Sequence, residues 1–149
     1  MNRALSALAS LFQLVYAAIC FVAVLNLTTV YRMLTTPEYR ATFGVGPLHA
    51  QVNLLLHTFR YDYSLALLLF GLHLILVGSL IVRSRYMPSW LGAILLIDGL
   101  GWIVIVLGPY LYPSANIGFV FITSLGEIVF MLWLLLVGSR LQEPAPALA

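Results

Sequence analysis

The segment YSLALLLFGLHLILVGSLIV, residues 63–82, decides the fold class, because it carries no Asp, Glu, Lys or Arg. A helix needs about 20 predominantly apolar residues to cross the hydrocarbon core of a bilayer. Within lipid, a single segment can satisfy its backbone hydrogen bonds internally only by forming a helix. The segment therefore predicts a transmembrane helix.

Further apolar runs lie at residues 4–31, 90–107 and 117–137. The whole chain is 62% hydrophobic and 8% charged, whereas a soluble domain is about 45–50% apolar and about 25% charged. The first run is longer than the apolar core of about 7–15 residues in a cleavable signal peptide, so it predicts a spanning helix. The sequence thus predicts an all-α polytopic transmembrane helical bundle, with four spanning helices in a single domain over residues 1–140.

The segments between the runs predict the remaining elements. Residues 32–46 contain proline, glycine and charged residues, which indicates an extramembrane loop. Pro47 suits the first turn of a helix. Apolar residues then recur at helical spacing up to Phe59, which predicts a short interfacial helix before the second span. Residues 141–149 contain two prolines and predict a disordered tail.

Arginine placement predicts the orientation in the membrane. The arginines at one end of the predicted spans are Arg3, Arg83, Arg85 and Arg140, and those at the other end are Arg32, Arg40 and Arg60. The positive-inside rule gives less weight to arginines in long loops, and the second group lies in the longer loop. The rule therefore predicts that both termini lie in the cytoplasm, and we expect the protein in the inner membrane. The net charge of +2 is too small to indicate a nucleic-acid partner. The expected partners are the lipid bilayer and either a second copy of the chain or another membrane protein.

Small residues recur every seven positions on the second and third runs. They are Ser64, Gly71 and Gly78 on the second run, and Gly92 and Gly99 on the third. A small residue every second turn lines one helix face and lets a neighbouring backbone approach closely. The short connection between these runs therefore predicts an antiparallel pair packed through its small residues. The alternative is that glycine is simply frequent in membrane helices.

The last three predicted spans each carry one ionisable residue near the middle: His73, Asp98 and Glu127. A charged Asp at a helix centre costs at least about 2.5–3.5 kcal/mol on insertion scales, so such groups usually face the bundle interior. We therefore hypothesise a polar core of these three side chains that relays protons or holds a cation or a metal. Spacing fixes their depth but not their rotation. For His73, the alternative is a neutral ring that hydrogen-bonds a neighbouring helix.

Three secondary candidates accompany this core. Asp62 lies three turns before His73 on nearly the same helical face, although a helix N-cap is its simplest role. Asn26 is expected to hydrogen-bond a neighbouring helix. Ser124 shares a helix face with Glu127, so its hydroxyl could hold the carboxyl group of Glu127 in its neutral form.

No cofactor or established metal motif is expected. Cys20 is the single cysteine, which excludes an internal disulfide and a zinc-type Cys pair. All three histidines fall between residues 49 and 73, whereas a haem with two histidine ligands needs them on facing helices. The sequence also has no Gly-rich phosphate loop, no Gly-x-Ser-x-Gly and no His-Glu-x-x-His.

Two motifs carry a resemblance to a known family. They are Phe70-Gly-Leu-His73 and Arg83-Ser-x-Tyr86-x-Pro88-x-Trp90-Leu-Gly92, supported by Gly99-Leu-Gly101, Gly126-Glu127 and the opening residues 2–15. With them, the chain resembles over residues 2–138 an uncharacterised family of bacterial integral membrane proteins, the domain of unknown function DUF4386. The resemblance implies a helical membrane architecture and no particular activity or cofactor. It aligns the start of the chain with the family's third helix, which implies either a shortened member or a fragment that lacks the first two helices.

These features favour a non-enzymatic membrane component, either a subunit or a small transporter-like module built around the mid-membrane polar residues. One alternative is an intramembrane metal-dependent hydrolase in which His73, Asp98 and Glu127 hold the metal. Another is a purely structural protein whose glycine faces drive oligomerisation.

Overall fold

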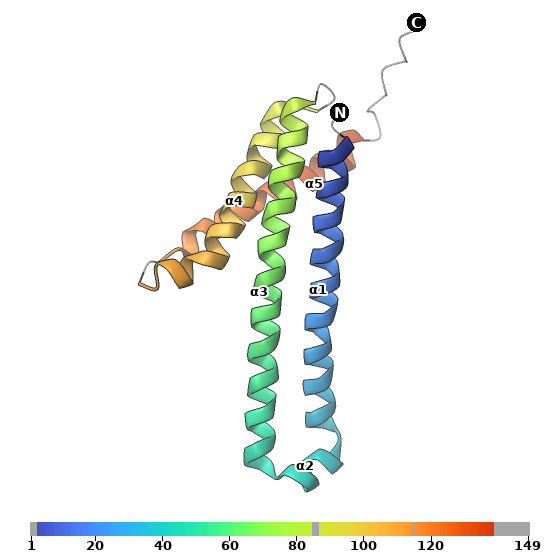
Figure 1. Cartoon of the computed structure of the whole chain (residues 1–149), viewed down its shortest axis with the longest axis vertical. Helices are drawn as coiled ribbons and strands as arrows, with labels where there is room; N and C mark the ends of the chain where they lie inside the picture. Colours follow the sequence, from blue (N-terminus) through green and yellow to red (C-terminus); the bar gives the residue numbers. More distant parts are fainter. Residues whose placement is uncertain (1–2, 85–86, 115, 139–149) are drawn as a thin grey trace, which may run out of the picture.

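The computed structural model describes residues 3–84, 87–114 and 116–138 (Figure 1). Over this part of the chain, all regular secondary structure is helical. The elements are α1 (Arg3–Thr35), α2 (Pro37–Phe43), α3 (Val45–Arg83), α4 (Ser89–Leu111), the 3₁₀ helix η1 (Gly118–Ser124) and α5 (Leu125–Val137). Four stretches are long and apolar enough to cross a membrane: α1, α3, α4, and η1 together with α5. The predicted all-α membrane fold is therefore confirmed, while the predicted disordered tail lies outside the described residues.

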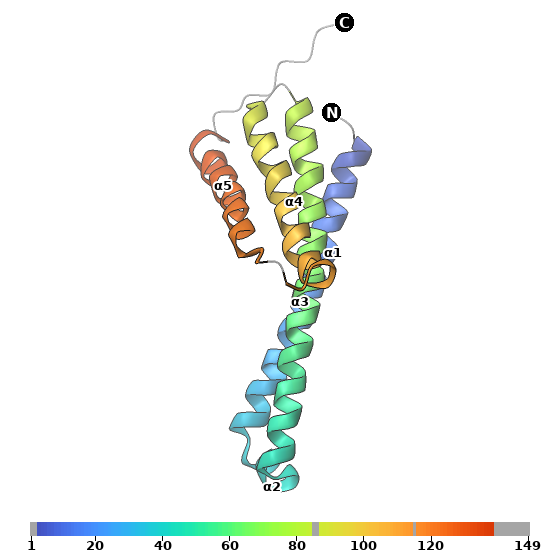
Figure 2. The same cartoon turned by 90° about the vertical axis from the view of Figure 1, so that its left-hand side faces the viewer.

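The helices form a long hairpin with a shorter pair attached to one side. Helices α1 and α3 run antiparallel and are joined through α2, and α4 packs on α3 away from α1 (Figure 1). The η1–α5 segment packs along α4. The start of α1, the end of α3, the start of α4 and the end of α5 all lie at the same end of the molecule (Figure 2). Arg3 and Arg83 therefore share one end, as the arginine pattern predicts, whereas Arg85 and Arg140 lie outside the described residues.

Helix α3 is continuous where the sequence predicted an interfacial helix followed by a separate span. At about 1.5 Å per residue, its 39 residues extend about 58 Å, roughly twice the hydrocarbon thickness of about 30 Å. The helix does not break because the apolar spacing that starts at Leu48 and Val52 continues without interruption into the span. Both residues are buried in a cluster with Val30 and Met33 of α1.

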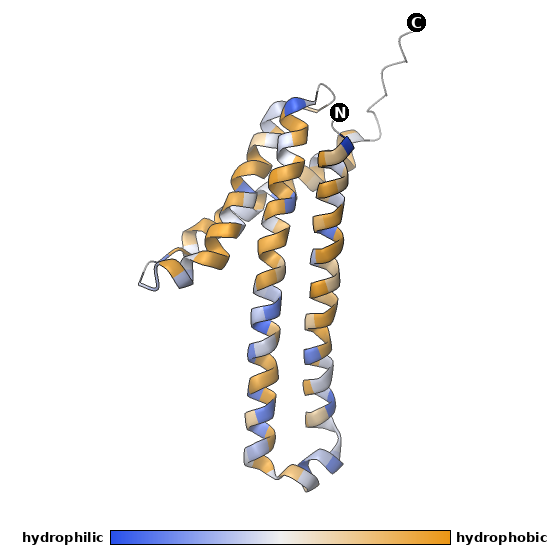
Figure 3. Ribbon diagram, in the orientation of Figure 1, coloured by the Kyte–Doolittle hydropathy of each residue, from blue (hydrophilic) through white to orange (hydrophobic). Residues whose placement is uncertain are grey.

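The predicted loop of residues 32–46 is also largely helical. Helix α1 continues to Thr35, and α2 starts at Pro37, whose fixed φ suits a first helical turn. A sharp reversal remains at Gly44, where φ is 75°, a value that favours glycine. Hydrophilic residues are concentrated around this end of the hairpin (Figure 3). The excess length of α1 and α3 therefore carries the hairpin end beyond the apolar part of the molecule.

The contact between α3 and α4 is built on glycine. A Cβ atom on Gly78 would lie 2.7 Å from the carbonyl oxygen of Gly92, and one on Gly99 would lie 2.6 Å from that of Gly71. The two backbones are thus in direct contact at two levels, which is the arrangement that the seven-residue spacing predicts. Because this glycine face is covered within the chain, it is not free to drive oligomerisation. The main buried cluster adjoins it and consists of Leu74, Ile81, Leu91, Leu95 and Trp102.

Candidate polar site

Asp98 is the centre of the polar site in the membrane part of the fold. It lies on α4, its side chain is 0% exposed, and its Oδ2 accepts a hydrogen bond of 2.8 Å from the backbone N–H of Glu127. Helix α5 begins at Leu125, so this N–H belongs to the first turn, where backbone donors have no partner within the helix. Asp98 therefore caps α5 from a neighbouring helix and brings α4 and the start of α5 together.

Gly126 makes this approach possible, and sequence reasoning did not single it out as a site residue. A Cβ atom at Gly126 would lie 2.7 Å from Cγ2 of Ile94 and 3.1 Å from Oδ2 of Asp98. Any side chain there would push α5 away from the carboxylate. The feature of the sequence that could have pointed to Gly126 is the Gly126-Glu127 pair in the family resemblance. Nothing in the sequence, however, placed this pair beside Asp98.

Two buried polar atoms near this contact have no hydrogen-bond partner within the described part of the chain. They are Oδ1 of Asp98 and Nε1 of Trp102, which lie four residues apart on one face of α4. That separation corresponds to about 6 Å along the helix axis. One atom is an acceptor when Asp98 is ionised and the other is a donor, and leaving either unpaired in an apolar surrounding is costly. The pair is therefore suited to a small polar species that both accepts and donates a hydrogen bond.

His73 faces a different helix from the one that carries Asp98. Its Nδ1 lies 2.9 Å from the carbonyl oxygen of Ala9 on α1. Because a carbonyl oxygen only accepts, Nδ1 carries the hydrogen and donates. On the same helix, Gly71 and Gly78 face α4. The structure therefore brings Asp98 and Glu127 into contact but leaves His73 out, and His73 adopts the alternative role of bonding a neighbouring helix.

Asp62 and Asn26 form a second polar contact on the α1-facing side of α3. The side-chain amide of Asn26 donates from Nδ2 to Oδ2 of Asp62 at 3.3 Å. Asp62 lies inside the continuous helix α3, so the prediction that it caps the start of a helix is wrong. The expected bond from Asn26 to a neighbouring helix is present, and Asp62 is its partner. Asp62 and His73 thus form a stripe along α3 that points to α1.

Ser124 does not hold the carboxyl group of Glu127. Its hydroxyl donates to the carbonyl oxygen of Phe121 at 2.7 Å, and the hydroxyl of Thr123 donates to that of Val120 at 2.8 Å. Both bonds run back three residues because the 3₁₀ turn of η1 brings those carbonyls within reach. The prediction that the Ser124 hydroxyl holds the carboxyl group of Glu127 is therefore wrong. Helix periodicity alone could not show this, because it assumes an α-helical turn at Ser124 where the chain forms a 3₁₀ turn.

A line of aromatic rings joins the helices at the level of the polar site. Successive ring centroids are 5.0 Å apart for Tyr16 and Phe70, 6.2 Å for Phe70 and Trp102, and 5.6 Å for Trp102 and Phe121. The line passes from α1 through α3 and α4 to η1 and fixes the orientation of the Trp102 indole. Sequence reasoning missed it, because the four residues have no common spacing.

The geometry does not support a metal-dependent hydrolase. Among the described residues, no group of three His, Cys, Asp or Glu side chains could hold a metal ion. The reason is the orientation of His73, which bonds to α1 and leaves only the two acids of α4 and α5 at the Asp98 contact.

Comparison with known proteins identifies the family. The family described as "Domain of unknown function (DUF4386)" matches residues 1–138. An "Uncharacterized protein" of the archaeon Archaeoglobus fulgidus is 33% identical over 142 residues, which cover 95% of this chain and 70% of that protein. No solved structure matches. With a match over nearly its whole length, the chain belongs to the DUF4386 family.

Proposed function

We propose that the protein is a small transporter-like membrane module that transfers protons, with Asp98 as the protonatable group. The observation that carries this proposal is the state of the Asp98 carboxyl group, which is fully buried, bonded through one oxygen to the N–H of Glu127, and unpaired at the other oxygen within the described residues. Intramembrane acids of this kind occur in proton relays and ion pathways.

The donor at Trp102 favours a proton over a metal cation. An indole N–H only donates, so it repels a cation and favours a group with a lone pair. A water molecule is the kind of ligand that this pair favours, because water can accept from an indole N–H such as Nε1 of Trp102 and donate to a carboxylate oxygen such as Oδ1 of Asp98. Protonation of Asp98 then reverses the second hydrogen bond without moving either helix. This geometry suits proton uptake and release at Asp98.

The form of the last span supports a transport role. It begins as the 3₁₀ helix η1 and becomes α-helical only at Leu125, next to Asp98. Helix termini at the coupling site are common in secondary transporters. Among the described elements, α5 packs only against α4 and η1, and 6% of the apolar window of this span is buried. Few tertiary contacts therefore hold α5 in one position relative to α4.

The test is proton flux into liposomes that contain the purified protein. A potassium gradient with valinomycin drives the flux, and a pH-sensitive dye in the lumen reports it. We expect the wild-type protein to exceed protein-free liposomes and Asp98→Asn to fall to their level, because the amide keeps the shape but cannot ionise. The matched control is Asp62→Asn, which changes a carboxyl group bonded to Asn26 outside the Asp98 contact.

Folding of each variant is checked by its helical circular dichroism and by its elution profile in detergent. Flux by the wild-type protein no greater than that of empty liposomes contradicts the proposal. So does full flux by a folded Asp98→Asn variant.

A further inference from the structure

A cavity of about 650 Å³ lies where α3, α4 and η1 diverge, away from the glycine contact. Its volume is in the range of about 300–1,000 Å³ that is typical of ligand pockets. It is lined by His57, Arg60, Tyr61 and Ser64 of α3, by Ile105, Val106, Pro109 and Tyr110 of α4, and by Phe121 of η1.

The register of the two helices explains why the cavity opens there. Gly78 lies opposite Gly92 and Gly71 opposite Gly99, so each step of seven residues along α3 matches seven along α4. The next step pairs Ser64 with Val106, and neither residue allows the backbone contact that glycine does. The helices therefore separate below the glycine levels, as the diverging ribbons of α3 and α4 show (Figure 1).

The mouth of the cavity is positively charged. Arg60 and His57 lie three residues apart on one face of α3, and no carboxylate lines the cavity. The nearest acid in the sequence, Asp62, bonds to Asn26 of α1 instead. Within the described residues, Arg60 forms no ion pair. The arginine is thus available to an anion from outside the chain.

The rest of the lining combines apolar side chains with tyrosine and serine. Ile105, Val106 and Phe121 form an apolar wall, and Tyr61 and Tyr110 also line the cavity. Tyrosine is enriched where the bilayer meets water. Helix α4 ends at Leu111, next to this cavity, after a length of 23 residues that suits one crossing. The cavity therefore combines a positively charged side, near the end of α4 where we expect lipid headgroups, with an apolar wall that suits an acyl chain.

We propose that this cavity binds one anionic phospholipid of the surrounding bilayer. Arg60 binds the phosphate through its planar guanidinium group, which matches the geometry of phosphate oxygens. His57 donates a further hydrogen bond to the phosphate, and an acyl chain lies along Ile105 and Phe121. This proposal goes beyond proton transfer at Asp98 and does not depend on it.

The test is native mass spectrometry of the full chain, which counts bound lipids during titration with phosphatidylglycerol or phosphatidylcholine. We expect one molecule of phosphatidylglycerol to bind in preference to phosphatidylcholine. Arg60→Gln should weaken binding of the anionic lipid about tenfold, which corresponds to the loss of a charge-assisted hydrogen bond. Arg60→Lys keeps the charge but loses the planar group, so its affinity for phosphatidylglycerol should lie between that of the wild type and that of Arg60→Gln.

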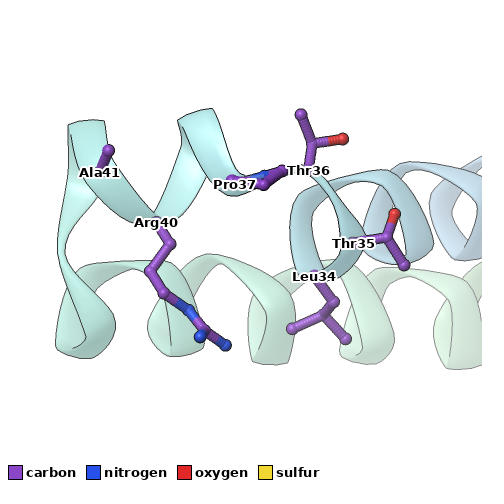
Figure 4. A pocket seen from close by; sticks show the side chains of 6 residues that line it. All are labelled: Leu34, Thr35, Thr36, Pro37, Arg40 and Ala41. Atoms are coloured by element: carbon purple, nitrogen blue, oxygen red, sulfur yellow. The ribbon is translucent and has the colours of Figure 1, made fainter.

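The matched control is Arg40→Gln. Arg40 belongs to a separate cavity of about 370 Å³ at the corner between α1 and α2, where threonine, proline and alanine lie beside it and no aromatic wall is present (Figure 4). We expect this variant to bind phosphatidylglycerol like the wild type.

Three results would overturn the lipid proposal. The first is equal binding of the two lipids, and the second is wild-type affinity in Arg60→Gln. The third is displacement of phosphatidylglycerol by millimolar inorganic phosphate, which would indicate an anion site that does not use the acyl chain.

Discussion

Helix α3 contacts α1 along one face and α4 along the other, and the two contacts use different chemistry. Against α4, Gly71 and Gly78 bring the backbones into direct contact. Against α1, the chain uses side-chain hydrogen bonds at His73 and Asp62, with Ala66 fully buried between them. In lipid, helices associate through close packing and interhelical hydrogen bonds rather than through the hydrophobic effect. Helix α3 thus uses close backbone packing on the face that meets α4 and side-chain hydrogen bonds on the face that meets α1.

The two mechanisms should differ in their tolerance of substitution. A backbone contact has no room for an added atom, and its neighbours cannot move without displacing a helix. A hydrogen bond between side chains can be lost while packing remains. We therefore expect the largest effects at the contact between α3 and α4 and smaller effects at the contact between α3 and α1.

The largest effect is expected for Gly99→Ala. Its new Cβ would lie 2.6 Å from the carbonyl oxygen of Gly71 and 2.8 Å from Cγ1 of Ile75. We expect a loss of about 1–3 kcal/mol in the free energy of unfolding, as for other overpacked contacts. Denaturant unfolding in mixed micelles, followed by circular dichroism, measures it. The control is Gly138→Ala, whose Cβ would come no closer than 3.8 Å to Leu134. Equal stability of the two variants would show that the glycine contact is looser than the structure indicates.

An intermediate effect is expected for His73→Leu. The variant loses the bond from Nδ1 to the carbonyl of Ala9 but keeps an apolar side chain of similar size. Interhelical hydrogen bonds in membranes contribute about 0.6 kcal/mol on average and at most about 1.7 kcal/mol, so we expect a loss of about 1 kcal/mol. The same unfolding measurement checks it, with the exposed His49→Leu as a nearly neutral control.

His73→Leu also sharpens the assignment of the polar site. Because His73 faces α1, proton flux in liposomes should be unchanged in this variant while it is lost in Asp98→Asn. Loss of flux in a folded His73→Leu variant would place His73 on the proton path, in conflict with its bond to Ala9.

The smallest effect is expected for the bond between Asn26 and Asp62. It is only partly buried and its length is 3.3 Å. A double-mutant cycle with Asn26→Leu and Asp62→Leu isolates this pair from the packing changes of each substitution. We expect a coupling of about 0.6 kcal/mol. Additive effects of the two substitutions would show that the contact provides no net stabilisation.

Local sequence patterns predicted much of the fold and part of the site. The apolar runs gave the four spans, and the seven-residue spacing placed Gly71 and Gly78 on one face of α3. The 100° rotation per residue also placed Asp62 and His73 together on the opposite face. Prediction failed where an element depends on distant contacts. Helix α3 is continuous where a separate interfacial helix was predicted, and the start of α3 packs on Val30 and Met33 of α1, a contact between residues far apart in the chain.

The sequence by itself determined that the chain has four helices long and apolar enough to span a membrane, and which residues share a helix face. These properties follow from the length of the apolar runs and from helix geometry, both of which are local. The tertiary structure alone decided which neighbour each face meets: α1 for His73, the start of α5 for Asp98, and an open cavity for Arg60. The rotation and pairing of helices depend on packing between residues far apart in the chain, and no local pattern contains that information.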